Sequence, residues 1–349
     1  PTACRLSAPP PRSSEKIDSR IRIRAARFEP DPASSADCQI GLHTGGHVGD
    51  QISRPAVAFN CDNHVAVVRS IASGIKEGMV GSHSNGSPFM ADPIIEVAED
   101  FWNFRGSYKI GGVVDVGTQA SLVRRANGKF LLLDAYTFSD DVVRYIGDLT
   151  RDGRDIEAIL NLHPFHTLHV EYAHKQYPEA TLYGTARHRT RFPTLPWDKL
   201  STEAVTLHEL FAEDLEFSVP RGVDFISADE NVHFSSVLAF HRTSNTIHSD
   251  DTLMYLSLPR LMKLFGLGDA ISFHPTLGKA LERRAGAAQD FREWAEEMIE
   301  EWRDAANLCA AHTATLLNRN NHGDSIHARV IKALRKAEST LRKHERKYG

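Results

Sequence analysis

The sequence predicts a globular α+β protein, on three observations. The 349 residues are 41% hydrophobic and 25% charged, the usual balance of a chain that buries a core. Short apolar runs bounded by Gly, Asn or Asp indicate strands, and an amphipathic stretch with acidic residues at its start indicates a helix. No run reaches the roughly 18 uncharged apolar residues of a membrane-spanning helix. We therefore expect no membrane partner.

The first third of the chain carries no recognisable motif. Residues 1–37 are rich in Pro, Ser and Arg and predict a disordered or processed arm. Residues 38–106 alternate Gly-rich turns with short apolar runs, which predicts an N-terminal elaboration of the sheet. The four cysteines are far apart and predict no disulfide framework. We expect a cytoplasmic protein, or an organellar one if the arm is the remnant of a targeting segment.

A hairpin and a helix follow. The apolar runs at 120–123 and 130–133 flank an Asn-Gly pair, which is a strong hairpin signal. Asp134 closes the second run. Ser139 is followed by two aspartates, so an N-cap and acidic first turn predict a helix over 139–149.

Histidines cluster at the end of the next strand. The apolar run 156–162 is followed by His163, His166 and His169. Neutral imidazole is the commonest metal ligand, and a loop after a buried strand can direct several side chains to one point. The segment therefore predicts a metal site. The alternative is that His163 closes the strand while His166 and His169 share a solvated helical face.

Further candidate ligands occur in the second half. His233 precedes the apolar run 236–240, and the pair Asp250 and Asp251 precedes another apolar run. The stretch 289–309 repeats apolar residues at helical spacing and predicts an amphipathic core helix. This helix is expected to return the chain so that His312, just after it, reaches the site.

The order of these residues resembles the metallo-β-lactamase superfamily over residues 107–317. The resemblance implies a four-layer αβ/βα sandwich, here with an N-terminal extension. The superfamily's first motif is His-x-His-x-Asp-His, and the Leu-Tyr-Gly strand end at 182–184 sets its alignment. Asn161 then takes the first histidine position, His163 the second, Phe165 the aspartate position, and His166 the last histidine position.

The later motifs of the superfamily align with His233, with Asp251 at the bridging aspartate, and with His312. The resemblance implies that these residues, with His163 and His166, bind metal, and that Asp251 and His233 are catalytic. It implies one or two zinc ions. Histidine and aspartate ligands also suit iron or manganese.

Two departures make the first motif degenerate. Phe165 can neither bind metal nor orient a water molecule, and Asn161 is a weaker donor than histidine. The changes favour a single-metal or rearranged centre. His169 is a provisional replacement ligand if it lies one helical turn beyond His166, or else a surface residue near the ligands. Asp250 is expected either to orient a ligand or to bind metal.

The resemblance implies a hydrolase that uses metal-bound water on an ester, thioester, lactone or related bond of a small molecule. The alternative is a catalytically lapsed binding or scaffold protein, motivated by Asn161 and Phe165. A nucleic-acid-processing hydrolase is less favoured. It is motivated by the nucleases of the superfamily and by the basic tail 329–347, which lies in the segment 318–349 expected to be a C-terminal helix. The net charge of −4 gives no general attraction to nucleic acid. Substrate and oligomeric state are left open.

Overall fold

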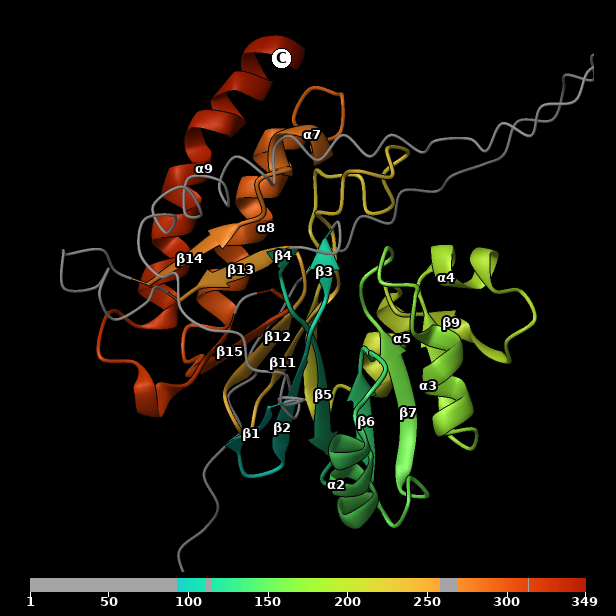
Figure 1. Cartoon of the computed structure of the whole chain (residues 1–349). Helices are drawn as coiled ribbons and strands as arrows, with labels where there is room; N and C mark the ends of the chain where they lie inside the picture. Colours follow the sequence, from blue (N-terminus) through green and yellow to red (C-terminus); the bar gives the residue numbers. More distant parts are fainter. Residues whose placement is uncertain (1–92, 111–113, 258–268, 313) are drawn as a thin grey trace, which may run out of the picture. The chain divides into compact units, whose positions relative to one another are not determined.

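The computed structural model describes residues 93–110, 114–257, 269–312 and 314–349. The arm expected at residues 1–37 lies outside the described residues. So does the N-terminal elaboration expected at 38–106, as far as residue 92. A seven-stranded sheet has the order β1-β2-β5-β6-β7-β8-β9, and a five-stranded sheet has the order β10-β11-β12-β15-β16 (Figure 1). Two small sheets pair β13 with β14 and β3 with β4.

The larger sheet and its helices come from the first half of the described chain. Its elements are β1 (Ile94–Ala98), β2 (Phe101–Gly106), β5 (Thr118–Arg124), β6 (Phe130–Leu133), α2 (Asp140–Thr150), β7 (Ile156–Asn161), α3 (Val170–Gln176), β8 (Thr181–Gly184), α4 (Ala186–Arg191), β9 (Trp197–Ser201) and α5 (Val205–Leu210). β5 and β6 form the predicted hairpin, and Ser139 precedes α2 as predicted. β6, β7 and β8 run parallel, so their carboxyl ends lie at one edge of the sheet.

The second sheet and the last helices follow. Their elements are β10 (Leu215–Ser218), β11 (Leu238–His241), β12 (Thr246–Ser249), β13 (Leu253–Leu256), β14 (Ala270–Phe273), α7 (Leu277–Ala280), α8 (Ala287–Glu301), β15 (Asn307–Ala310), β16 (Thr315–Leu316), η1 (Asn318–Asn320) and α9 (Ile326–Tyr348), while β3 (Lys109–Ile110) and β4 (Val114–Asp115) form a separate ribbon. β12 and β15 are parallel. The single helix predicted over 289–309 is wrong, because α8 ends at Glu301 and a buried strand brings the chain to His312. A short apolar run does not by itself distinguish a strand from a helix.

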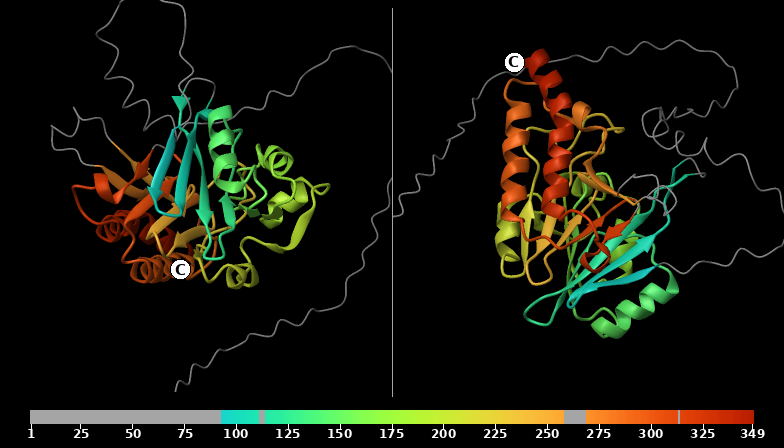
Figure 2. Two further views of the ribbon diagram at one scale, coloured as in Figure 1. Left: turned by 90° about the horizontal axis from the view of Figure 1, so that it is seen from below. Right: turned by 90° about the vertical axis from the view of Figure 1, so that its left-hand side faces the viewer.

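The hydrophobic side chains form three clusters that separate four layers. Phe130 and Leu132 of β6 pack with residues of α2 and α3. Leu131 and Leu133 point to the other face and pack with Ala239 of the second sheet. The far face of the second sheet packs against α8 and α9. The pleat of each strand thus supplies both neighbouring clusters, and the predicted αβ/βα sandwich is confirmed (Figure 2).

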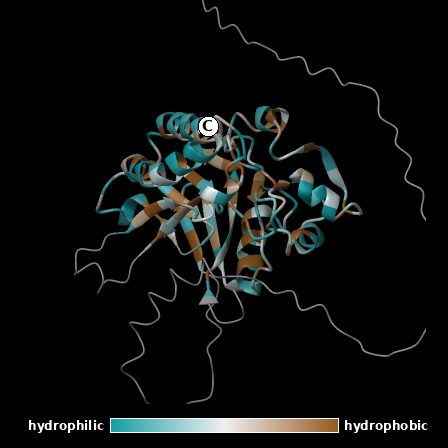
Figure 3. Cartoon of the chain, turned by 90° about the horizontal axis from the view of Figure 1, so that it is seen from above, coloured by the Kyte–Doolittle hydropathy of each residue, from teal (hydrophilic) through white to brown (hydrophobic). Residues whose placement is uncertain are grey.

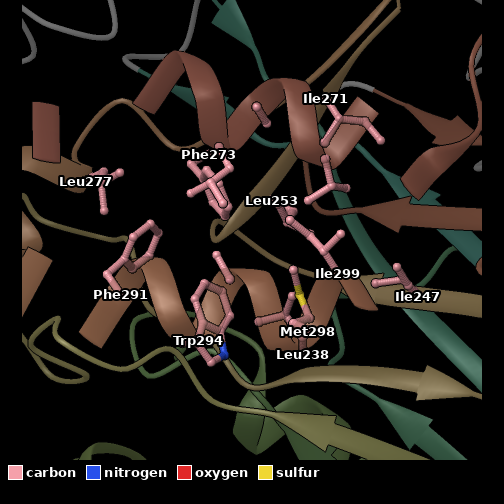
Figure 4. Packing of buried hydrophobic residues seen from close by; sticks show 14 of the residues in the cluster. Leu238, Ile247, Leu253, Ile271, Phe273, Leu277, Phe291, Trp294, Met298 and Ile299 are labelled. Atoms are coloured by element: carbon pink, nitrogen blue, oxygen red, sulfur yellow. The ribbon is translucent and has the colours of Figure 1, made fainter. Parts of the chain in front are cut away.

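The cluster beneath α8 is the most extensive of the three. Phe291, Trp294 and Met298 of α8 lie against Phe273 and Leu253 of the β13-β14 pair (Figure 4). The helix expected in the basic tail is α9, whose apolar residues pack into the same cluster. Colouring by hydropathy shows hydrophobic strands between helices with hydrophilic outer faces (Figure 3). No helix in the described ranges is long and apolar enough to cross a membrane.

Gly222 is required by its backbone and by its contact with the start of α8. Its φ is +70°, and a Cβ atom there would lie 2.0 Å from the carbonyl oxygen of Ala287. We expect Gly222→Ala to lower the free energy of unfolding by about 3 kcal/mol, combining backbone strain with overpacking. Gly128 is the matched control, because its φ is +80° but its Cβ would meet nothing within 4 Å. Equal losses of stability in urea titrations of the two alanine variants would contradict the packing argument.

Candidate metal site

Polar residues gather where the parallel strands of both sheets end. Asp134 follows β6, His163 follows β7, and Asp251 and His312 come shortly after β12 and β15. Strand ends are held firmly by the ladders of the sheets, so side chains from four loops can be directed to one place. The contacts of Asp251 with His163 and His312 show that these side chains do meet.

Asp251 is the centre of this group, and its side chain is almost fully buried. Its Oδ2 lies 3.2 Å from Nε2 of His163 and 3.9 Å from Nε2 of His166. Its Oδ1 lies 2.8 Å from Nε2 of His312. Donor atoms of His163, His166 and Asp251 lie within 4.8 Å of one another and form a candidate metal site. The structure therefore brings together four of the residues predicted from the sequence.

The second nitrogen of each ring decides which histidines offer a lone pair. Nδ1 of His312 lies 3.1 Å from the carbonyl oxygen of Gly117, which only accepts, so Nδ1 donates and, in a neutral ring, Nε2 carries the lone pair. His163 is arranged the other way. Its Nδ1 accepts the backbone N–H of Phe165 at 3.0 Å, so a neutral ring carries its proton on Nε2, facing Asp251. His163 is within reach of the site but is arranged to donate a hydrogen bond to Asp251.

His166 lies at the mouth of the group with 29% of its side chain exposed. Its ring stacks on that of His163 at a centroid distance of 4.1 Å. Nδ1 faces Oδ2 of Asp250 at 3.5 Å, and Nε2 faces Asp251. His166 is thus placed between two carboxylates, with one ring nitrogen toward each.

The charges of the metal-free group follow from these contacts. Burial and the neighbouring His166 lower the pKa of His163. Burial also opposes the charge on His166, but Asp250 and Asp251 outweigh it and raise the pKa of His166 to about 9. Asp251 likewise outweighs burial at His312 and raises its pKa. Burial disfavours the charged form of Asp251, yet His312 and His163 hold the pKa of that carboxyl well below its ordinary value.

These shifts predict how the stability of the metal-free protein depends on pH. The pKa of His166 is higher in the folded state than its unfolded value of about 6.5. The charged ring therefore stabilises the fold fully below about pH 6.5, and this stabilisation is lost as the pH rises through about 9. We expect a loss on the order of 2 kcal/mol between pH 6.5 and 9.5, measured by urea unfolding with a chelator present. His166→Ala should lose much less; an equal loss in both proteins would contradict the assignment.

Two predicted residues lie elsewhere. Asn161, at the first histidine position, is buried and donates from Nδ2 to the carbonyl oxygen of Tyr183 at 2.8 Å. His169 precedes α3, and its Nδ1 lies 3.1 Å from Oγ1 of Thr137. The helical face that His169 was predicted to share with His166 is wrong, because residues 163–169 form turns rather than helix. Helical spacing does not apply to a turn that begins at a proline.

His233 lies beside the group, not within it. Its ring stacks on Phe165 at 4.7 Å, and its centroid is 6.4 Å from that of His163. Nε2 donates to the carbonyl oxygen of Glu230 at 2.5 Å. Arg187 lies 4.4 Å from the centre of the Phe165 ring and pairs with the Glu230 carboxylate. Phe165, the predicted counterpart of the motif aspartate, thus lies in an aromatic and cationic cluster.

Sequence reasoning missed two buried residues beside the site. Asp134 and His248 have donor atoms within 4.8 Å of each other and of Asp250. The signal for Asp134 was a carboxylate directly after a run of leucines. The signal for His248 was a histidine inside an apolar strand, two residues before the aspartate pair. Neither residue type alone predicts a partner, because both partners come from distant parts of the sequence.

The fold and the site define this protein as an αβ/βα sandwich with a candidate histidine and aspartate metal site at the edge of its sheets. No family model and no curated protein matches the sequence. Solved structures that match include metallo-β-lactamases. One from Erythrobacter litoralis is 12% identical, with 72% of this chain and 99% of that chain covered and a TM-score of 0.47.

A metallo-β-lactamase from Pontibacter korlensis is 9% identical, with 70% of this chain and 99% of that chain covered and a TM-score of 0.45. One from Pseudomonas aeruginosa, solved in a mono-zinc form, is 10% identical, with 71% and 96% covered and a TM-score of 0.44. These are likenesses of fold.

Proposed function

We propose that this protein is a metal-dependent hydrolase in which Asp251, His166 and His312 hold a single ion. The observation that carries the proposal is the set of donor atoms that meet at one buried carboxylate. Nε2 of His166 and Nε2 of His312 both face Asp251, at 3.9 Å and 2.8 Å. Asp251 is 2% exposed, and a buried charge is costly unless it is paired or binds a metal. A cation held between Asp251 and the two neutral rings would balance this charge.

The donor types fit a transition metal. Two imidazoles and a carboxylate suit zinc first, with iron or manganese also accommodated. Catalytic zinc sites use three protein ligands and keep one position open for water or substrate. His166 and His312 keep 29% and 18% of their side chains exposed, so this position is accessible from solvent. We therefore infer a catalytic rather than a closed structural site.

Each neighbouring residue has a role that follows from its contacts. A bound ion would act as a Lewis acid and lower the pKa of a water molecule. His163 donates from Nε2 to Asp251 and holds that carboxylate in place. The carbonyl of Gly117 fixes the ring of His312. His233 donates from Nε2, which leaves Nδ1 as the nitrogen that can take up a proton at the mouth of the site.

We propose esters, thioesters, lactones and related bonds of small molecules as substrates. The test is a panel of such compounds assayed with zinc, iron or manganese and after chelation. We expect hydrolysis that requires metal, and a fall in kcat of about 100-fold or more for His233→Ala with metal still bound. The exposed His322 provides the matched control variant, His322→Ala. Full activity of the chelated protein would overturn the proposal.

A lapsed binding protein is the second candidate, and two observations favour it. Asn161 is turned toward Tyr183, and Phe165 packs against His233 where a carboxylate would otherwise stand. A protein that binds metal but hydrolyses no member of the panel, with substrate analogues still binding, would establish this second function. Metal-dependent turnover would exclude it.

A further inference from the structure

A buried polar group lies beside the proposed ligands, on the side of the second sheet. It contains Asp134, His248 and Asp250, with 4%, 0% and 2% of their surfaces exposed. His248 is engaged at both nitrogens, with Nε2 at 3.1 Å from Oδ2 of Asp134 and Nδ1 at 2.9 Å from Oγ of Ser121. Oδ1 of Asp134 accepts the backbone N–H of Leu162 at 2.8 Å. Asp134 and His248 are therefore fully partnered.

Asp250 differs from the other two members. Its Oδ2 is buried and has no partner that meets hydrogen-bond geometry. The same oxygen lies 3.5 Å from Nδ1 of His166, the nitrogen that faces away from Asp251. Oδ2 of Asp250, which lacks a hydrogen-bond partner, is thus directed at His166, a proposed metal ligand.

We propose that Asp250 is the positioning residue of the metal site, accepting the Nδ1 proton of His166 so that Nε2 is presented to the ion. The inference rests on the proposed metal site and deepens it. Histidine ligands commonly donate their second ring N–H to a carboxylate or a carbonyl, which fixes both tautomer and orientation. His312 already has this arrangement, with the carbonyl of Gly117 as its acceptor. Asp250 supplies the equivalent acceptor for His166.

Asp134 and His248 lie beside Asp250, with donor atoms within 4.8 Å of its carboxylate. Their own bonds to the Leu162 N–H and the Ser121 hydroxyl fix both residues in place. The same three residues have donor types that suit a second metal ion. Such an ion would have to displace the bond between His248 and Asp134, and the existing partners of both residues make a supporting group the better assignment.

The first test needs no variant. In the zinc-loaded full-length protein, long-range proton–nitrogen NMR of the histidine rings reports which nitrogen carries the proton. We expect Nδ1 of His166 to be protonated and Nε2 to bear the metal. A His166 ring bound to zinc through Nδ1 would overturn the inference. A merely structural Asp250 would not fix this tautomer.

The second test measures zinc affinity by competition with a chromophoric chelator. We expect Asp250→Ala to weaken binding by about 10-fold to 100-fold, as for other carboxylates that orient metal ligands. Asp250→Asn should recover part of the loss, because its amide oxygen still accepts a hydrogen bond. Asp148→Ala, at an exposed site on α2, is the control and should leave the affinity unchanged.

The remaining outcomes separate the two proposals. Equal zinc affinity in wild type and Asp250→Ala would overturn the role of Asp250 while leaving the metal site intact. Two zinc ions in the wild type, one of them lost in Asp134→Asn, would show a second metal site in place of a supporting group. A wild-type protein that binds no zinc would overturn the metal site and this inference together.

Discussion

Asp251→Asn should lose zinc binding and, with it, metal-dependent hydrolysis. Asp251 is the carboxylate that faces His163, His166 and His312, and it is 2% exposed. Removing one partner of a buried charged group costs about 3–5 kcal/mol, which corresponds to a loss of affinity of at least about 100-fold. The asparagine keeps the size of the side chain but loses the charge that balances a divalent ion.

Chelator competition gives the affinity, and hydrolysis of any substrate found in the panel gives the activity. Asp148→Asn on the exposed face of α2 removes the same charge away from the site and serves as the control. The two measurements on Asp251→Asn should fall together. Zinc affinity within tenfold of the wild-type value would show that Asp251 is not a ligand.

The second large effect is expected at Phe291, in the core beneath α8. Phe291 is 0% exposed and lies beside Phe273 and Trp294 (Figure 4). The centre of its ring is 5.2 Å from that of Phe273, 5.3 Å from that of Trp294 and 5.8 Å from that of Phe234. Phe291→Ala leaves a cavity among rings that cannot collapse onto it. We expect the free energy of unfolding to fall by about 3–5 kcal/mol.

Urea titration monitored by circular dichroism measures this loss. Leu210 is 51% exposed, so Leu210→Ala controls for removal of a large hydrophobic side chain at the surface. Its cost should stay near 0.5 kcal/mol, as is typical of surface substitutions. A cost of Phe291→Ala similar to that of Leu210→Ala would mean that the cluster of rings does not anchor α8.

The parts of the fold that could be predicted are those with a local physical cause. The Asn-Gly turn between β5 and β6 and the acidic start of α2 depend on neighbouring residues only. The boundary after α8 could not be predicted in this way. Asn307–Ala310 is a strand because it pairs with β12 and is buried on both sides, and both causes lie in distant residues.

The same distinction between local and distant causes applies to the candidate site. The order of motifs along the chain predicted that His163, His166, Asp251 and His312 lie together, and the contacts around Asp251 place these candidate ligands side by side. The directions of the ring nitrogens could not be predicted, since they depend on the Phe165 N–H and the Gly117 carbonyl. The buried group of Asp134, His248 and Asp250 likewise joins residues from distant parts of the chain, which no local pattern connects.

The metal content of the purified protein tests the central claim most directly. Elemental mass spectrometry should find a single zinc, iron or manganese ion per chain in the wild type, and almost none in the variants His166→Ala and His312→Ala. His322→Ala should retain the full amount. A wild-type protein that stays free of metal after all three ions have been supplied would contradict the account.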